Sequence, residues 1–194
     1  MFFSEEAVRC PLYGQQIFDM AKKLMKIKGF MDVYSHDKLP DMTVMKTKLK
    51  STNGEPVCLI INTANDDAKG QHWQALWFSP PRPCCREGGG EDRMVRDVEF
   101  YDSYGLPPMV QEKTTWPFLQ ELMEEGSLLD WPDFTMQNIF NRNSAACGYH
   151  CLLYLLCKTI WPEEDMNAML EQIYSKTELD MNDRIAVAFI NKIC

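Results

Sequence analysis

The segment at residues 148–160 constrains the fold most, because it is apolar on every side of a helix. A surface helix carries one apolar stripe, whereas a helix that is apolar all round lies inside a core. The run is also far shorter than the roughly 20 apolar residues that span a bilayer. We therefore expect a buried helix at the centre of a globular protein, and no membrane-spanning segment.

Other segments predict helices and strands around this core helix. Apolar residues at helical spacing predict helices at residues 15–28, 116–125, 165–174 and 182–193. Alternating or continuous apolar runs predict strands at residues 43–50, 57–62, 72–78 and 95–101, with a short strand or extended segment at residues 134–140. Since no repeat or linker divides the 194 residues, we predict a single α+β domain over residues 1–194, with helices packed on a small sheet.

Charge and the N-terminal residues limit the partners and the compartment. A net charge of −8 argues against a mainly electrostatic hold on nucleic acid or acidic lipid. Lys46, Lys48 and Lys50 share one face of the strand predicted at residues 43–50, and we favour a solvated surface over a DNA-binding patch there. Acidic residues near the N-terminus, with no long apolar run after them, argue against an export signal. We therefore expect a protein that is intracellular or that reaches its site inside a particle.

The eight cysteines are expected to be free thiols, because the chain carries no sign of export. Two close clusters raise the question of zinc, and their members are Cys84, Cys85, Cys147, His150 and Cys151. Neither cluster has the paired spacing of a structural zinc site, so we expect no metal.

Cys147 is the candidate nucleophile. It stands where a loop enters the apolar segment, so its thiol is predicted to lie at a helix N-terminus. Unpaired backbone N–H groups and the positive end of the helix dipole favour a thiolate at such a position. The thiolate is the reactive form of cysteine. The alternative is a core cysteine that happens to begin a helix.

His72 and Asp102 are the candidates for a base and its orienting carboxylate. Histidine accepts a proton near neutral pH, and the chain has three histidines. His150 is the rival, but it follows Cys147 on the same helix, from where an approach to a substrate is awkward, so we favour His72. Asp102 ends the next predicted strand, where an ordinary turn residue is the alternative. Each residue alone has a structural explanation, and together they point to nucleophilic catalysis.

At these residues the sequence resembles the adenovirus endopeptidase family of cysteine proteases and, more distantly, the SUMO-specific proteases. The likeness lies in residues 61–76 with the pair His-Trp, in Tyr-Asp-Ser-Tyr-Gly at residues 101–105, and in Asn-Ser-Ala-Ala-Cys-Gly at residues 143–148. It covers roughly residues 30–160. The resemblance implies an α+β fold with a mixed central sheet flanked by helices, and the catalytic cysteine at the N-terminus of a buried helix.

The resemblance also implies residue roles in peptide-bond hydrolysis through an acyl-enzyme. It assigns Cys147 as the nucleophile, His72 as the base and acid, and Asp102 as the orienting residue. The family places an oxyanion-hole glutamine six or seven residues before the cysteine, where this sequence has Phe–Asn. We favour Gln137 over Asn141 as the amide donor, with the backbone N–H of the cysteine as the second donor.

The substrates implied by the resemblance are proteins or peptides cut after small residues of the Gly-Gly or Gly-X type, such as viral capsid and core precursors. The place of action would be the host nucleus or cytoplasm, and the virion if the enzyme is packaged. The family's activating peptide and DNA do not carry over directly, because no cysteine lies between Cys85 and Cys147 and the chain is acidic. We expect no cofactor and no strong DNA binding, and an activating peptide stays open.

Three alternatives share the same constellation of residues. One is an isopeptidase for ubiquitin-like modifiers, and another is an acyltransferase that uses the same triad. The third is an inactive descendant that only binds partners.

Overall fold

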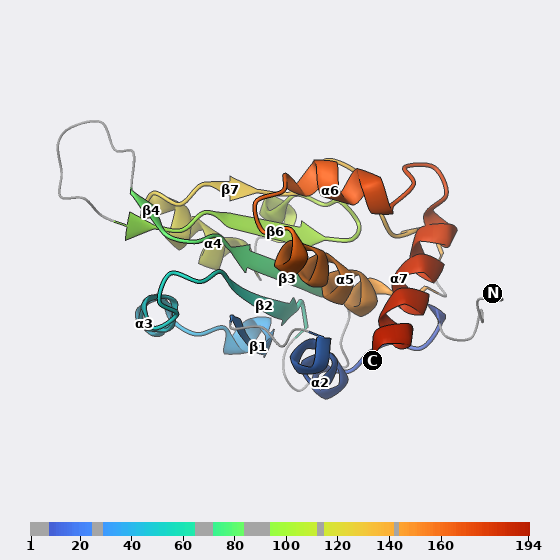
Figure 1. Ribbon diagram of the computed structural model, residues 1–194, viewed down its shortest axis with the longest axis horizontal. Coiled ribbons are helices and arrows are strands. Elements are labelled where there is room, and N and C mark those ends of the chain that lie inside the picture. The colour runs from blue at the N-terminus through green and yellow to red at the C-terminus, as the bar shows by residue number, and fades with distance from the viewer. Residues whose placement is uncertain (1–7, 25–28, 65–71, 84–93, 112–114, 142–143) are drawn as a thin grey trace.

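The fold is built on a mixed five-stranded sheet (Figure 1). The computed structural model describes residues 8–24, 29–64, 72–83, 94–111, 115–141 and 144–194. In spatial order the strands are β1 (Phe30–Ser35), β2 (Val57–Asn62), β3 (Trp73–Phe78), β6 (Val98–Asp102) and β7 (Leu129–Asp130). The three central strands pair antiparallel, whereas β1 and β7 run parallel to their neighbours at the two edges. The predicted α+β fold with a mixed central sheet is confirmed.

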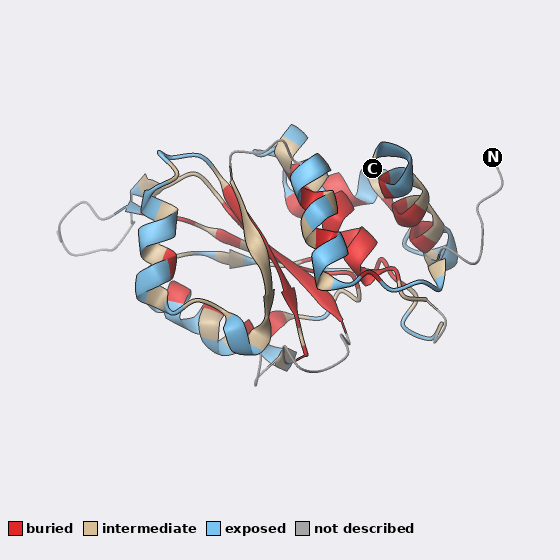
Figure 2. Ribbon diagram, turned by 90° about the horizontal axis from the view of Figure 1, so that it is seen from below, coloured by how far each residue is buried: buried red, intermediate tan, exposed pale blue. Residues whose placement is uncertain are grey.

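Helices cover both faces of this sheet. One face carries α2 (Gly14–Leu24), α5 (Cys147–Ile160), α6 (Met166–Ile173) and α7 (Leu179–Ile193), and the other carries α3 (Met42–Lys50) and α4 (Thr115–Glu124). Side chains alternate between the faces along β2, so Cys58 and Ile60 pack in one core, and Leu59 and Ile61 pack in the other. Figure 2 shows the buried residues along the strands and on the inner sides of the helices. α5 is buried along nearly its whole length, as its all-round apolarity predicts.

The short elements lie at the ends of this framework. β4 (Arg82–Pro83) and β5 (Met94–Val95) form a separate two-stranded sheet, and η1 (His36–Lys38) and η2 (Pro108–Gln111) are short 3-10 helices. The strand predicted at residues 95–101 is therefore divided between β5 and β6. Within the described ranges, no helix combines the length and the apolarity that crossing a bilayer requires.

The prediction of a strand at residues 43–50 is wrong, because this segment forms α3. The Asp41 side chain accepts a hydrogen bond of 2.9 Å from the backbone N–H of Val44, which caps the helix. Met45 is fully buried, and Leu49, one turn further on, packs against the same core. The missing strand of the sheet is β1, which the sequence analysis did not predict. The cap and the i, i+4 spacing of apolar residues outweigh the alternation of the lysines.

The lysines of this segment consequently do not share one face. Residues two apart on a helix point about 200° from one another. Lys46 forms an ion pair with Glu125, whereas Lys48 donates a hydrogen bond of 2.8 Å to the Tyr34 hydroxyl. The single basic face expected from residues 46, 48 and 50 is therefore absent.

Residues 134–140 form turns and bends without a strand, between β7 and α5. The backbone N–H groups of Met136 and Gln137 both donate to the carbonyl oxygen of Ser103, at 2.9 and 2.8 Å. This segment therefore lies against the turn that follows β6. The short strand that the sequence allowed here is therefore absent.

The turn after β6 requires glycine at position 105. Gly105 has a φ of 67°, in the left-handed region, and a Cβ there would lie 2.5 Å from the carbonyl oxygen of Phe134. That oxygen belongs to the backbone, so it cannot rotate away. Gly54 has a φ of 86°, but a Cβ there would meet no atom within 4 Å. Both glycines have a positive φ, which favours glycine. Of the two, only Gly105 also lacks the space for a Cβ atom.

We expect Gly105→Ala to lower the free energy of unfolding by more than about 3 kcal/mol. Gly54→Ala is the matched control and should cost only about 1–2 kcal/mol, the penalty of the left-handed backbone alone. Urea unfolding of both variants measures the difference. Equal losses would contradict the close contact between Gly105 and Phe134.

Candidate active site

His72 and Asp102 meet at one end of the sheet. His72 immediately precedes β3, and Asp102 is the last residue of β6, its antiparallel neighbour. His72 Nε2 lies 2.9 Å from Asp102 Oδ1, and both side chains are buried. Two of the residues that the sequence singles out are therefore in direct contact.

The carboxylate of Asp102 is held by further donors. Its Oδ1 also accepts a hydrogen bond of 2.8 Å from the backbone N–H of Tyr104, and its Oδ2 accepts one of 2.9 Å from Gln74 Nε2. The Gln74 amide is fixed in turn, because its Oε1 accepts from the Thr115 hydroxyl at 2.8 Å. Gln74 was not among the residues predicted for the site, although strand alternation puts it on the same side as His72. An anchored carboxylate of this kind fixes the orientation and tautomer of a histidine ring.

The His72 ring is held from its face as well as from its edge. The Tyr104 ring stacks on it, with centroids 4.3 Å apart and planes 8° from parallel. Burial lowers the pKa of His72, but the charge and the hydrogen bond of Asp102, with the interaction of Cys147, outweigh burial and raise the pKa to about 10. The ring is therefore protonated near neutral pH, which is the state that stabilises a neighbouring thiolate.

Cys147 is the first residue of α5, as predicted. Its sulfur interacts with the His72 ring. Nε2 is taken by Asp102, and Nδ1 has no hydrogen bond that meets normal geometry among the described residues, so Nδ1 is the atom left to face the sulfur. Such contacts often tighten only when a substrate binds. The backbone N–H of Cys147 has no intrahelical acceptor, since it belongs to the first turn.

Gln137 lies between the two segments that carry these residues. It is fully buried, its Oε1 accepts from Ser103 Oγ at 2.7 Å, and its Nε2 donates to Ser144 Oγ at 3.2 Å. Ser103 directly follows Asp102, and Ser144 stands three residues before Cys147. The amide is therefore fixed beside the start of α5.

Asn141 takes a different direction. Its Nδ2 donates to Asp180 Oδ1 at 3.1 Å, in an exposed contact with α7. Of the two amides that the sequence leaves open, that of Gln137 donates to Ser144 in the loop before Cys147, whereas that of Asn141 donates to Asp180 on α7.

His150, the rival base, is not available to Cys147. Its Nδ1 lies 3.0 Å from the Tyr174 hydroxyl, and its Nε2 lies 2.9 Å from Asp183 Oδ1. Both ring nitrogens are occupied, and the ring is fully buried. The geometry therefore favours His72.

In the part of the chain that the structure describes, no group of three or more His, Cys, Asp or Glu residues is arranged so that it could hold a metal ion. Cys10, Cys58, Cys151, Cys157 and Cys194 are free thiols there, as is Cys147. Cys84 and Cys85, which the sequence groups with Cys147 and Cys151, lie outside the described residues.

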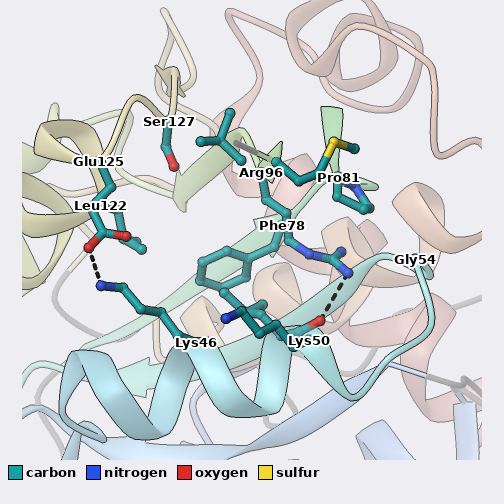
Figure 3. A pocket seen from close by; sticks show the side chains of 12 residues that line it. Lys46, Lys50, Gly54, Phe78, Pro81, Arg96, Leu122, Glu125 and Ser127 are labelled. Carbon is teal, nitrogen blue, oxygen red and sulfur yellow. Dashed lines mark hydrogen bonds and ion pairs between the residues drawn. The ribbon is translucent and has the colours of Figure 1, made fainter. Parts of the chain in front are cut away.

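A separate pocket lies at the other end of β3 (Figure 3). Phe78 forms part of its floor, and Lys46 and Glu125 close one side with their ion pair. The Arg96 guanidinium lies beside it and donates to the Leu49 carbonyl oxygen at 3.1 Å. Residues 72 and 78 are six positions apart on extended backbone, which puts them about 20 Å apart. This pocket is therefore not the substrate cleft of the His72 site.

The raised pKa of His72 predicts a pH-dependent contribution to stability. A histidine whose pKa is higher in the folded state than its ordinary 6.5 stabilises the fold fully below pH 6.5. That contribution declines as the pH rises and is lost at about pH 10. We expect the difference in unfolding free energy between the protein and His72→Gln to shrink steadily over this range. Urea unfolding at several pH values measures it, and a difference that is constant or grows with pH would contradict the ion pair.

Comparisons with known proteins give sequence relatives and partial structural likenesses. No family model matches the chain. The protease of porcine adenovirus A serotype 3 is 26% identical over 115 residues, which are 56% of this chain and 50% of that protein. The protease of human adenovirus B serotype 3 is 24% identical over 153 residues, which are 69% of this chain and 66% of that protein. The matches thus span about half to two thirds of these relatives' length.

Among solved structures, the ASFV pS273R protease superposes with a TM-score of 0.49 at 14% identity, over 92% of this chain and 67% of that one. The central domain of the uncharacterized Lpg1148 protein from Legionella pneumophila gives a TM-score of 0.46 at 14% identity, over 93% of this chain and 98% of that one. The sequence matches show that the chain is a distant relative of the adenovirus proteases.

Proposed function

We propose that the chain is a cysteine-type endopeptidase that hydrolyses peptide bonds after small residues of the glycine type. One observation carries the proposal: an anchored histidine–carboxylate pair at the ends of two neighbouring strands lies against a thiol at the N-terminus of a buried helix. A protonated imidazole and a helix N-terminus both stabilise a thiolate, and a thiolate in such a position is a nucleophile. The similarity to adenovirus proteases supports the same reaction class.

In the proposed first half-reaction, the Cys147 thiolate attacks the carbonyl carbon of the scissile bond. A C–S bond forms, and the carbonyl electron pair moves onto oxygen. The backbone N–H of Cys147 and the Gln137 amide would donate to that oxyanion. The intermediate collapses, the C–N bond breaks, and His72 Nδ1 gives its proton to the leaving amine. The products are an acyl-enzyme and a new N-terminus.

In the second half-reaction, His72 takes a proton from water, and the resulting hydroxide attacks the thioester carbon. The C–S bond breaks, and the thiolate and the protonated imidazole are restored. Asp102 keeps the ring in place through both steps, because its carboxylate is bonded to His72, Tyr104 and Gln74 together.

Limited access to the sulfur supports a preference for small residues at the cut. Cys147 exposes 8% of its surface and His72 exposes 8%. The Tyr104 ring covers one face of the imidazole. A residue without a bulky side chain would let the scissile carbonyl reach the thiol. We propose structural precursors of a virus as the substrates, in the host nucleus or cytoplasm and in packaged particles.

An electrophilic peptide that ends in glycine tests this function. We expect a glycine peptide aldehyde or vinyl sulfone to label Cys147 selectively, as mapped by mass spectrometry, and a peptide library to be cut after glycine. Absence of selective labelling would favour an inactive protein that only binds partners. Cleavage of a ubiquitin-like C-terminal reporter but not of the library would favour an isopeptidase. Acyl-CoA-dependent transfer to lysine or serine would favour an acyltransferase.

A further inference from the structure

A second buried histidine–carboxylate pair lies behind the loop that precedes Cys147. His150 on α5 and Asp183 on α7 are both fully buried, and Figure 1 shows these helices side by side. His150 Nε2 lies 2.9 Å from Asp183 Oδ1, and its Nδ1 lies 3.0 Å from the Tyr174 hydroxyl. A buried carboxylate costs free energy unless its oxygens have partners. The proposed proton transfers use none of these groups, so the pair needs another explanation.

The second oxygen of Asp183 leads to the candidate oxyanion donor. Asp183 Oδ2 accepts a hydrogen bond of 2.6 Å from Ser144 Oγ, a length typical of a charge-assisted bond. A serine hydroxyl has one hydrogen, so this donation leaves only lone pairs toward Gln137. Gln137 Nε2 accordingly donates to Ser144 Oγ at 3.2 Å. The carboxylate therefore determines which end of the Gln137 amide faces Ser144.

The other end of the amide agrees with this orientation. Gln137 Oε1 accepts from Ser103 Oγ at 2.7 Å. An amide nitrogen carries two N–H groups, and Ser144 accepts one of them, so one N–H is left to donate to a ligand. A flipped amide would turn an oxygen toward a developing oxyanion and repel it. The directions of the two hydrogen bonds that link Asp183 to Gln137 through Ser144 therefore matter for catalysis.

We propose that Asp183, acting through Ser144, is a positioning residue that orients the Gln137 amide so that its remaining N–H faces the oxyanion formed at Cys147. His150 fixes the carboxylate from the opposite side. None of Asp183, His150 and Ser144 touches the reacting atoms. The inference rests on the proposed function, because it names the support of that site's oxyanion hole.

Asp183→Asn is the direct test. The new amide keeps an oxygen for His150 and presents its NH2 group to Ser144. The hydrogen of the Ser144 hydroxyl is then free to turn toward Gln137, so the hydroxyl no longer fixes which end of the Gln137 amide faces it. We expect kcat on a glycine-type peptide to fall roughly 100-fold, with KM within about twofold of the parent value. The rate at which iodoacetamide alkylates Cys147 should stay within about twofold, because alkylation forms no oxyanion.

Matched variants separate positioning from general loosening. Asp180 lies on the same helix, is exposed and accepts from Asn138 and Asn141 at 3.1 Å, so Asp180→Asn removes an equal charge without reaching Gln137. It should leave kcat unchanged. Ser144→Ala should reproduce the loss, and Ser144→Thr, which keeps the hydroxyl, should restore most of it. The Ser144 variants also serve if Asp183→Asn does not fold.

The side-chain amide signals of Gln137 in ¹H–¹⁵N spectra give a readout without turnover. We expect them to move in Asp183→Asn and Ser144→Ala but not in Asp180→Asn. Unmoved signals in the first two variants would overturn the inference, whatever the activity. Equal falls in kcat and in the alkylation rate, or an unchanged kcat, would also overturn it. Turnover missing from the unmodified protein would instead contradict the proposed peptidase, while the Gln137 signals still decide the positioning role.

Discussion

Replacing Cys147 by alanine is expected to abolish peptide hydrolysis, with a loss on the order of 10⁶-fold as in other triad enzymes that lose their nucleophile. The other two residues of the triad cannot replace the nucleophile, because His72 is protonated near neutral pH and Asp102 is held by three hydrogen bonds. Progress curves with a fluorogenic peptide that has glycine before the cut measure the loss. Peptidase activity that survives in purified Cys147→Ala would rule out the proposed mechanism.

Cys151 provides the control within the same helix. It lies one turn after Cys147 and is fully buried, and burial raises the pKa of its thiol well above the usual value, so it stays protonated and unreactive. Cys151→Ala removes a sulfur of the same kind from the same core. We expect it to lower stability by about 1 kcal/mol and to keep activity near that of the parent. A matching loss of activity in both variants would point to damage of α5 rather than to loss of a nucleophile.

The helices and strands could be predicted where the pattern of apolar residues in the sequence matches the burial of the element in the fold. All-round apolarity identified α5, and largely apolar runs identified β2 and β3. The prediction of a strand at residues 43–50 failed because lysines at alternate positions resemble the pattern of a strand. The helix is instead specified by the cap at Asp41 and by one buried face. β1 was missed although four of its six residues are apolar or aromatic, because Asp32 interrupts the short run.

Some residues of the candidate site could be predicted from the sequence, and others could not. Cys147, His72 and Asp102 stand at the ends of predicted elements, where side chains with chemical function are often placed, so the sequence could single them out. The role of Asp183 could not be found in this way, because its link to the site runs through hydrogen bonds between residues 39 positions apart. Gln74 was missed for a related reason, since its partner stands 28 positions away on another strand. Such pairs depend on tertiary packing, which a local pattern does not encode.

The second large effect is expected on kcat when the amide of Gln137, rather than that of Asn141, is removed. Gln137→Ala removes the amide fixed beside α5, and we expect kcat to fall by about 100- to 1,000-fold, the usual cost of losing one oxyanion donor. Asn141→Ala removes an exposed contact to Asp180 and should leave kcat nearly unchanged. Steady-state kinetics on one peptide substrate compare the two directly. The reverse ranking would move the oxyanion donor to Asn141.

Loss of the Gln137 side chain also leaves the Ser103 hydroxyl without its acceptor and removes one of the two partners of the Ser144 hydroxyl, so a fall in activity has to be separated from a loosened site. Gln137→Glu keeps the volume and can still accept from Ser103, but a carboxylate would repel the oxyanion instead of donating to it. We therefore expect Gln137→Glu to lose at least as much kcat as Gln137→Ala. In both variants the alkylation of Cys147 by iodoacetamide should stay near the parent rate, because that reaction needs the thiolate and His72 but no oxyanion hole. If alkylation slows in step with hydrolysis, Gln137 supports the thiolate pair itself and the amide has no separate role in the transition state.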